Sequence, residues 1–309
     1  MITTLNLYFR VIGFILLFCK ISPACATEIS TILGFGQENF SFNIEEIGGG
    51  RAPIKYEPNM AGVSRFGLGY GDFSIGASFR SSSKDLDPQK GTTNYFDVQL
   101  GYHNRKWGLD TYYQTYQGFY TANTNLIQLF PDLKFRHYGL MGRYALTDSD
   151  FSVGALMDQS DEVKNSAGKI YLIGGLQQHE MDSPTSLLIQ ENAGINSDLE
   201  KLRKLKVSSL NLGLGAGRYW VNDNHFFIGA MLDVMGTLGL YTYENDSQVK
   251  EESSYATLSP DIKLGLGYAG QTYKFGLSAV ADITTLRTPG SAFIKPASQK
   301  LLLYMRIML

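Results

Sequence analysis

The sequence predicts an all-β protein, a transmembrane antiparallel β-barrel of about 14 strands with 12 as the alternative. Three observations indicate this fold: apolar and polar residues alternate over stretches of about ten residues, aromatic residues flank the short turns, and short and long connections alternate. A tilted strand of about ten residues crosses a bilayer, and only a closed sheet leaves no backbone unpaired in lipid. We therefore expect short periplasmic turns and long extracellular loops.

The stretch 93–120 shows the pattern most clearly. Every second residue from Phe96 to Tyr102 is apolar or aromatic, the turn 103–106 is polar, and the alternation resumes at Trp107. Side chains alternate between the two faces of a strand, so this stretch predicts a hairpin of two strands that each have one apolar face.

Aromatic residues recur on both sides of the other short turns. The pairs are Tyr70 and Phe73, Tyr144 and Phe151, Trp220 and Phe226, and Tyr268 and Tyr273. Rings at one end of many strands form a belt at the depth of the lipid headgroups. A soluble β-sandwich or barrel is the alternative, but soluble sheets seldom repeat long strands with one aromatic rim.

Residues 1–26 are predicted to be a cleaved signal peptide, so the barrel domain is 27–309. Arg10 precedes an apolar run, and Ala24, Cys25 and Ala26 fit a small-x-small cleavage site. The alternative is a lipoprotein acylated at Cys25. Both cysteines lie in this segment, so the mature chain has no disulfide and needs another constraint, which closure of a sheet supplies.

The predicted strands alternate direction from a periplasmic start to a periplasmic end. They are 39–47, 62–70, 73–80, 93–102, 107–116, 134–145, 150–159, 168–177, 184–192, 207–220, 226–234, 261–268, 273–282 and 300–309. The strand 184–192 is included because the direction of its neighbours requires one more crossing. A capping box at Ser197 predicts a helix over 197–206 in an outer loop, and 81–92 and 117–133 are predicted long loops. The apolar strand 300–309 is the segment that the barrel-assembly machinery would recognise, although it ends in Leu309 where an aromatic residue is usual.

Composition agrees with this class. The net charge is −2 for the whole chain, and removing Arg10 and Lys20 makes it −4, which does not favour nucleic acid as a partner. Glycine is frequent, with 33 of 309 residues, and mean hydropathy is −0.11. Such middling hydropathy is typical of strands that alternate lipid-facing and lumen-facing residues.

The sequence contains no recognisable catalytic or cofactor motif. Its four histidines, at 103, 137, 179 and 225, have no metal-ligand spacing, and we expect no metal and no cofactor. His103 and His225 are expected to be solvated turn residues. Inward glycines at 213, 215, 217, 265, 267 and 276 are expected to leave one side of the lumen nearly bare.

Inward polar positions are the candidate functional residues. They are Asp97, Gln99, Asp110, Tyr112, Gln114, Arg143, Asp233, Lys263, Lys274, Asp282, Tyr304 and Arg306. Their mixed charges fit either internal salt bridges that fill the barrel or a hydrated, solute-selective pore. The aromatic residues between 112 and 120 could bind a sugar or an apolar ligand, but packing in the lumen and the aromatic belt is the favoured role.

A second candidate site is the basic run Lys201, Arg203, Lys204 and Lys206. On an outer loop these cations could bind the phosphates of outer-leaflet glycolipid. A solvated surface is the simpler interpretation.

Several motifs resemble an uncharacterised family of predicted bacterial outer-membrane proteins, known as a domain of unknown function. The motifs are YEPN at 56–59, FDVQ at 96–99, YQTYQGFY at 113–120, FSV at 151–153 and SAG at 166–168. The resemblance covers most of the mature chain and implies a barrel in the bacterial outer membrane without implying a chemistry.

The sequence therefore favours an outer-membrane barrel that binds or passively passes a small solute through a narrow pore. An outer-membrane enzyme acting on lipid or peptide is an alternative, although no nucleophile motif is present. A structural or adhesive anchor that uses the long loops is a third possibility.

The predicted orientation can be tested by labelling intact cells. A cysteine placed at Asn104 or Asp223 should be protected from an impermeant thiol reagent, and one at Asp85 should react. The reverse pattern would show that the orientation is inverted.

Overall fold

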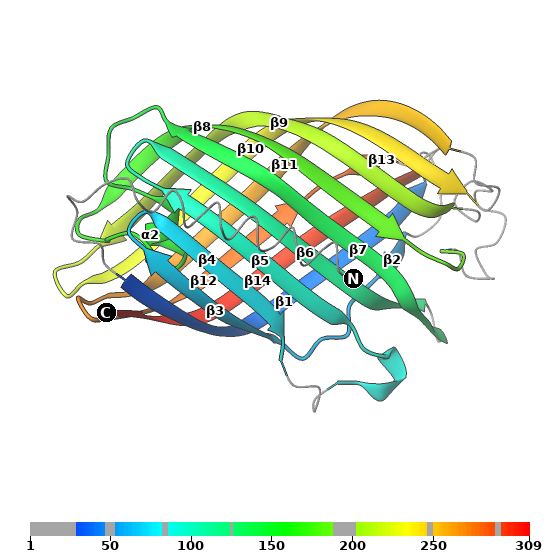
Figure 1. Ribbon diagram of the computed structural model, residues 1–309, viewed down its shortest axis with the longest axis horizontal. Helices are drawn as coiled ribbons and strands as arrows, with labels where there is room; N and C mark the ends of the chain where they lie inside the picture. The colour runs from blue at the N-terminus through cyan, green and yellow to red at the C-terminus, as the bar shows by residue number, and fades with distance from the viewer. Residues whose placement is uncertain are drawn as a thin grey trace, which may run out of the picture.

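Twelve antiparallel strands of eight or more residues follow one another around a closed barrel in the computed structural model (Figure 1). The structure describes residues 29–46, 53–81, 86–123, 126–187, 202–245, 250–287 and 292–309. The barrel closes where the first strand pairs with the last, from Ser30 opposite Met308 to Glu46 opposite Ala292. Closure gives both edges of the sheet hydrogen-bonding partners, which a sheet in lipid requires.

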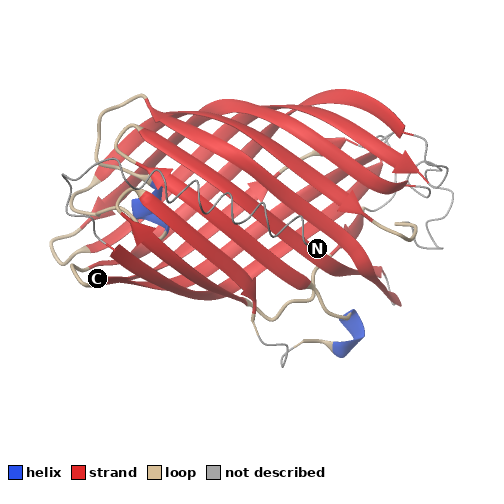
Figure 2. Ribbon diagram, viewed as in Figure 1, coloured by secondary structure: helices blue, strands red, loops and turns tan. Residues whose placement is uncertain are grey.

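The element bounds are as follows. The long strands are β1 (Ile29–Glu46), β3 (Val63–Tyr70), β4 (Phe73–Arg80), β5 (Asn94–His103), β6 (Trp107–Asn123), β7 (Leu126–Ala145), β8 (Ala167–Asp182), β9 (Leu202–Val221), β10 (Phe226–Asn245), β11 (Lys250–Ala269), β12 (Tyr273–Ile283) and β14 (Ala292–Met308). The short elements are the strands β2 (Ile54–Tyr56) and β13 (Leu286–Arg287), the 3-10 helix η1 (Pro88–Lys90) and the helix α2 (Val153–Met157) (Figure 2).

The predicted fold class is confirmed, and the sheet contains 14 strands. Two of them are not the strands that the sequence predicted, because β2 and β13 are short segments that pair with β1 and β14. We call the end of the barrel with the short turns and the start of β1 the turn end, and the opposite end the loop end. At the loop end, Glu57, the residue directly after β2, also forms a bridge with Tyr120 of β6.

The predicted strand 150–159 is wrong, and it caused a second wrong prediction. This segment holds α2, whose N-cap Ser152 accepts a hydrogen bond from the Ala155 N–H, and Figure 2 shows it inside the turn end. Because it does not cross the membrane, β7 and β8 already alternate in direction and no crossing at 184–192 is needed. Residues 184–187 are not a strand, and 188–192 lie outside the described residues.

The loop-end half of the wall was also mispredicted. Residues 202–206, expected in a helix, begin β9, while 197–201 lie outside the described residues. Most of the predicted loop 117–133 is a continuation of β6 and β7. Similarly, β1 begins at Ile29 and β14 at Ala292, in each case before the predicted start.

These errors share a physical cause, which β1 shows. Its outward residues change from Leu33 and Phe35 to the polar Gln37, while its inward Phe40 and Phe42 are buried. The apolar face of one continuous strand therefore moves from the outside to the inside at the edge of the membrane. A prediction that assumes one constant apolar face along a strand therefore ends the strand at this point.

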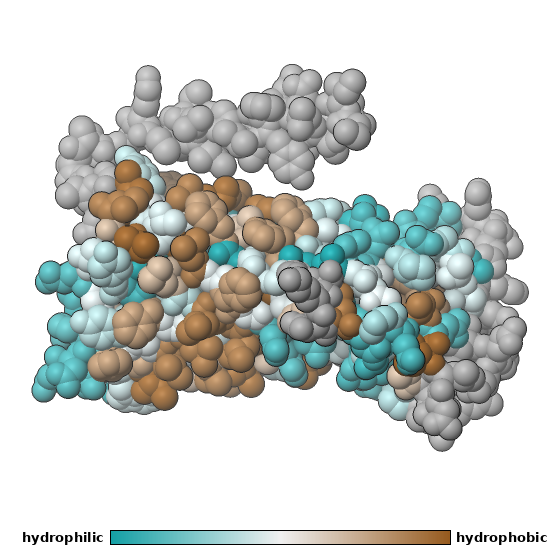
Figure 3. Space-filling view, turned by 90° about the horizontal axis from the view of Figure 1, so that it is seen from below, coloured by the Kyte–Doolittle hydropathy of each residue, from teal (hydrophilic) through white to brown (hydrophobic). Residues whose placement is uncertain are grey.

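The outer surface carries an apolar band near the turn end and is hydrophilic toward the loop end, where the barrel projects beyond the band (Figure 3). The aromatic belt is present: the rings of Trp107 and Tyr144 pack in a tilted arrangement at 4.6 Å, and those of Phe226 and Tyr268 at 5.3 Å, between ring centroids. Phe151 is an exception, since it is buried inside the barrel. No helix among the described residues is long and apolar enough to cross a membrane, and the predicted signal peptide 1–26 lies outside them.

The facing of the wall residues can be tested with two outward substitutions. Leu264→Arg lies within the apolar band and should lower the free energy of unfolding by about 2–4 kcal/mol, the cost of a charge facing lipid. Gln37→Arg also points outward but lies beyond the apolar stretch of β1, so it should cost little. Urea titrations in vesicles measure both, and equal costs would contradict the assigned membrane boundary.

Candidate functional site

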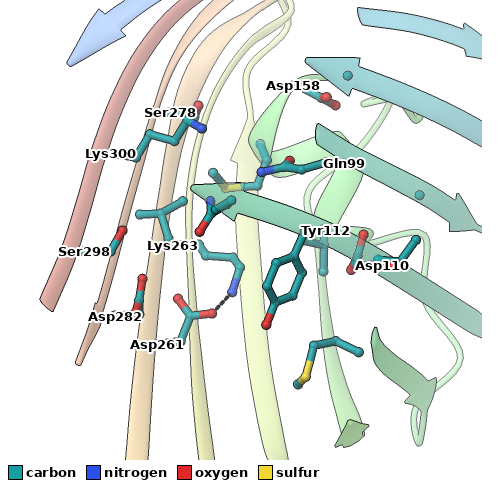
Figure 4. Close-up of a pocket in the computed structure, with 18 of the residues that line it drawn as sticks. Gln99, Asp110, Tyr112, Asp158, Asp261, Lys263, Ser278, Asp282, Ser298 and Lys300 are labelled. Carbon is teal, nitrogen blue, oxygen red and sulfur yellow. Dashed lines mark hydrogen bonds and ion pairs between the residues drawn. The ribbon is translucent and has the colours of Figure 1, made fainter. Parts of the chain in front are cut away.

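The middle of the barrel contains a cavity of about 320 Å³, which we call the chamber. Figure 4 shows polar side chains from opposite walls directed into it, including Gln99 and Tyr112 on one side and Asp261 and Asp282 on the other. Ten charged side chains line the chamber: Glu38, Arg65, Asp110, Arg143, Asp158, Asp261, Lys263, Asp282, Lys300 and Arg306. Five are acidic and five are basic, so the lining is balanced in formal charge.

An apolar layer closes the chamber toward the loop end. Phe40 stacks on Tyr116 at 4.4 Å, and Phe42 stacks on Tyr56 at 4.6 Å between ring centroids. These rings belong to a buried cluster of the described residues: Phe40, Phe42, Ile44, Ile54, Tyr56, Val63, Tyr95, Tyr116, Phe119, Phe130, Leu133, Phe135, Met181, Leu187, Leu202, Leu205, Val207, Tyr241, Tyr243, Leu286 and Ile294. We call this cluster the loop-end seal. The aromatic residues Tyr116 and Phe119 therefore pack inside the seal.

A folded-in segment closes the turn end. Residues 146–166 connect β7 to β8 and turn into the barrel, where Phe151 and Leu156 are fully buried. Phe151 stacks on Tyr219 at 5.2 Å, and the Tyr219 hydroxyl donates to the Asp150 carbonyl at 3.0 Å. We call 146–166 the plug.

The inward glycines accommodate the plug. A Cβ on Gly217 would overlap the Phe151 ring, and one on Gly265 would overlap the Leu156 carbonyl oxygen. A Cβ on Gly229 would lie 2.8 Å from the Leu156 side chain. The expectation of a bare lumen wall is thus wrong, because the plug occupies the space beside the glycines of β9 to β11.

Polar contacts hold the plug to the strand β14. The Arg306 guanidinium lies 3.3 Å from the Asp158 carboxylate and donates to the Asp158 carbonyl at 2.9 Å. Burial acts to raise the pKa of the Asp158 carboxyl, but Arg306, Arg65 and the Ser160 hydrogen bonds outweigh burial, so this pKa lies below its ordinary value. The carboxylate is therefore charged at neutral pH and pairs with Arg306.

A first charge cluster surrounds Lys300. Its ammonium lies 3.0 Å from Glu38 and 3.1 Å from Asp97, and both carboxylates are fully buried. The hydroxyls of Tyr95 and Tyr116 donate to Glu38 at 2.9 and 2.7 Å. Removing Lys300 would therefore leave two carboxylates buried without a cation, which is costly.

A second charge cluster joins β6, β7, β10 and β11. The Arg143 guanidinium contacts Asp110 at 2.5 Å and Asp233 at 3.3 Å. Lys263 lies 3.1 Å from Asp233 and also pairs with Asp261, as Figure 4 shows. Each cation bridges two carboxylates, and Asp233 is shared, so every charged group of this cluster has an ion-pair partner although three carboxylates face two cations.

Two chamber residues remain outside these clusters. Of the ten charged side chains that line the chamber, only Arg65 and Asp282 form no ion pair with another described residue. Arg65 donates to Gln99 at 3.1 Å, and its buried Nε atom has no hydrogen-bond partner in the described structure. The chamber thus contains one basic and one acidic side chain without an ion-pair partner among the described residues, and a ligand could bind to both.

All twelve predicted lumen residues lie inside the barrel. Eight line the chamber: Gln99, Asp110, Tyr112, Gln114, Arg143, Lys263, Asp282 and Arg306. The other four, Asp97, Asp233, Lys274 and Tyr304, are buried inside it. The mixed charges are mostly paired, which agrees with the interpretation of internal salt bridges, while the solute-selective pore stays a prediction.

Sequence analysis missed Glu38, Arg65, Asp158 and Lys300. Glu38 lies in the part of β1 that was not recognised, and Asp158 was assigned to a strand that does not exist. Arg65 and Lys300 belong to predicted strands, and their inward parity could have identified them.

Three histidines occupy the interior. His103, expected to be solvated, forms a 2.8 Å hydrogen bond to Asp110, and the rings of His137 and His179 stack at 4.0 Å. The Tyr112 hydroxyl lies 2.9 Å from His137 Nε2. Within the described ranges no group of three His, Cys, Asp or Glu residues is arranged to hold a metal ion.

The basic run does not form a helix. Arg203, Lys204 and Lys206 lie on β9, where Lys204 is 3.7 Å from Glu244, while Lys201 is outside the described residues. Contact with glycolipid stays a prediction.

A closed barrel with an apolar outer band and an aromatic belt defines the class: the chain is an outer-membrane β-barrel protein. The family model described as a domain of unknown function (DUF4421) matches residues 34–304, and the chain belongs to this family. No protein among the curated sequences matches the chain.

Solved structures with a similar fold include three outer-membrane proteins at low similarity. The toluene transporter TodX of P. putida is 10% identical with a TM-score of 0.31, over 93% of this chain and 91% of that one. An outer membrane channel from Pseudomonas putida F1 is 11% identical with a TM-score of 0.39, over 94% and 100%. The β domain of the Bordetella autotransporter BrkA is 12% identical with a TM-score of 0.37, over 92% and 99%.

The seating of the plug can be tested with a matched pair of glycine substitutions. Gly217→Val should displace Phe151 and destabilise the barrel by about 1–3 kcal/mol, the usual cost of overpacking. Gly236→Val should not, because a Cβ there meets its nearest atom at 3.6 Å. Limited proteolysis within 146–166 should increase only for Gly217→Val, and equal cleavage of the two variants would contradict the packing of the plug.

Proposed function

We propose that this barrel binds a small zwitterionic solute in the chamber and passes it across the outer membrane. The observation that carries the proposal is that Arg65 and Asp282 form no ion pair among the described residues, in a chamber whose other charged lining residues all do. A solute with an ammonium group and a carboxylate, such as an amino acid, would neutralise both residues. A solute with one charge would leave the other residue without a partner.

The size of the chamber supports a small solute. A volume of about 320 Å³ is at the lower end of the usual range for ligand sites. The ion-paired side chains of the lining can also form hydrogen bonds with a bound molecule, and they add no net charge. A polar solute would therefore bind in a defined orientation.

The two seals support selective passage over an open pore. Apolar layers lie toward both ends of the chamber, so we expect a steady ion current through the closed barrel to be small. Passage then requires movement of the plug or of another part of the wall. The sequence predicted a passive narrow pore, and this proposal specifies that the pore is gated.

Binding can be measured by equilibrium dialysis of the refolded protein with radiolabelled glycine, alanine and glutamine. Asp282→Asn and Arg65→Gln should each weaken binding at least tenfold, because each removes one of the two charges that the solute would contact. Asp223→Asn, in an exposed turn away from the chamber, is the matched control and should bind as the wild type does. Planar-bilayer recordings should show little current for wild type and a larger one when 149–162 is replaced by a Gly-Ser linker.

Two results would overturn the proposal. One is the absence of saturable binding of any of these amino acids at millimolar concentration. The other is binding that both chamber substitutions leave unchanged. Either result would leave the charged interior as a structural network.

A further inference from the structure

The wall of the barrel has an interrupted seam between β11 and β12. These strands pair from Ala269 opposite Lys274 up to Asp261 opposite Asp282. Beyond that row β11 continues to Lys250, but among the described residues its segment 250–260 pairs with β10 alone. On the other side of the seam, β12 ends at Ile283 and β13 pairs with β14.

Proline contributes to this interruption. Pro260 is the first residue of β11 beyond the last pair with β12, and a proline has no N–H to donate to a neighbouring strand. Pro296 lies on β14 at the same side of the chamber, where its carbonyl accepts from the Thr284 N–H at 3.1 Å. An unpaired edge is unfavourable in lipid unless it borders a polar cavity, and here it does.

The seam leads into the chamber. Pro260, Asp261, Asp282 and Thr284 are at the seam and are also chamber-lining residues. Asp282 is the acidic one of the two residues that form no ion pair among the described residues, and it lies at the inner side of the seam. Arg65, on β3, is three strands away from β12 around the wall.

The outer side of the seam is apolar. Leu258 on β11 is 69% exposed, and Leu238 and Leu240 on the neighbouring β10 are 60% and 67% exposed. Ile283 points outward on the opposite flank and is 54% exposed. Leu258 continues the lipid-facing row of β11, and Leu238 and Leu240 continue that of β10. On β1, by contrast, the outward row has become polar by Gln37.

We propose that the seam is a lateral doorway for an amphiphile from the leaflet at the loop end, the predicted outer leaflet. Its zwitterionic head enters the chamber with the ammonium group at Asp282 and the carboxylate toward Arg65. Its hydrocarbon chain stays outside against Leu238, Leu240 and Leu258. The inference rests on the proposed function and adds the substrate class and the route, because buried apolar clusters lie toward both ends of the barrel while this seam is flanked by apolar residues outside and polar ones inside.

The route can be tested by closing the seam. The mature chain is predicted to be free of cysteine, so Pro260→Cys with Ile283→Cys places two thiols outward on opposite flanks, where a short bismaleimide can join them. The control joins Lys206→Cys to Thr242→Cys, two directly paired residues of β9 and β10, and closes nothing. The probe is N-dodecylglycine with a diazirine at the chain end, added to protein reconstituted in phosphatidylcholine vesicles.

Photolabelling of the wild type should concentrate on peptides that contain Leu238, Leu240 and Leu258, and Asp282→Asn should reduce it at least tenfold. The linked seam should lose the labelling to the same extent, while the linked control retains it. A dodecanol diazirine, which has the chain without the charges, should label the band without dependence on Asp282.

The outcomes separate the two proposals. If glycine binds in the chamber but labelling by the alkylated probe is unchanged by linking the seam, the doorway is excluded and the proposed function stands. If Asp282→Asn leaves labelling unchanged, whether or not the seam is linked, the amphiphile does not use the chamber and the inference fails. If no amino acid binds at all, the proposed function fails first.

Discussion

Every backbone N–H and C=O at membrane depth must have a partner, and this requirement explains most of the molecule. The pairing of β1 with β14 meets it by joining the ends of the sheet over nearly the whole length of both strands. Once the ring is closed, alternation assigns each side chain to lipid or to the interior. The polar residues that a soluble sheet would place in water must then find partners inside. The ion pairs, the plug and the chamber all follow from that requirement.

The interior is filled in three layers, and the small residues of the wall decide where they lie. Near the turn end, the glycines of β9 to β11 have no side chains, and Phe151 and Leu156 of the plug occupy the space inside the barrel beside them. Near the loop end, aromatic side chains fill the interior of the barrel. The chamber between them keeps its polar lining because nearly every charge has a partner. A buried ion pair contributes little net stability, whereas a buried charge without a partner is costly. Arg65 and Asp282 are therefore the residues whose placement structure alone does not explain.

The interrupted seam shows how a closed barrel can keep one opening in its side. From the pair of Asp261 and Asp282 to the turn end, β11 pairs with both β10 and β12. Toward the loop end, it pairs with β10 alone among the described residues. The loss of β12 as a hydrogen-bonding partner of β11 costs less free energy here than it would in mid-membrane, because polar groups of the chamber are adjacent. The fold thus combines a continuous wall in the membrane with a local edge at its boundary.

The sequence by itself determined the barrel, the facing of the mid-membrane residues and the inward polar set, because alternation with a period of two depends only on neighbours along the strand. It failed where the environment changes along a strand, as in β1, where Phe40 is buried inside although Phe35 faces outward. It also assigned Phe151 to the wall, since an alternating segment looks the same whether it crosses the membrane or folds into the barrel. Only the tertiary structure decided that the glycines of β9 to β11 face a plug. Only it showed that Lys300 joins Glu38 to Asp97 and that Asp282 forms no ion pair with another described residue. Such pairings connect strands far apart in sequence, and they exist only once the sheet has closed.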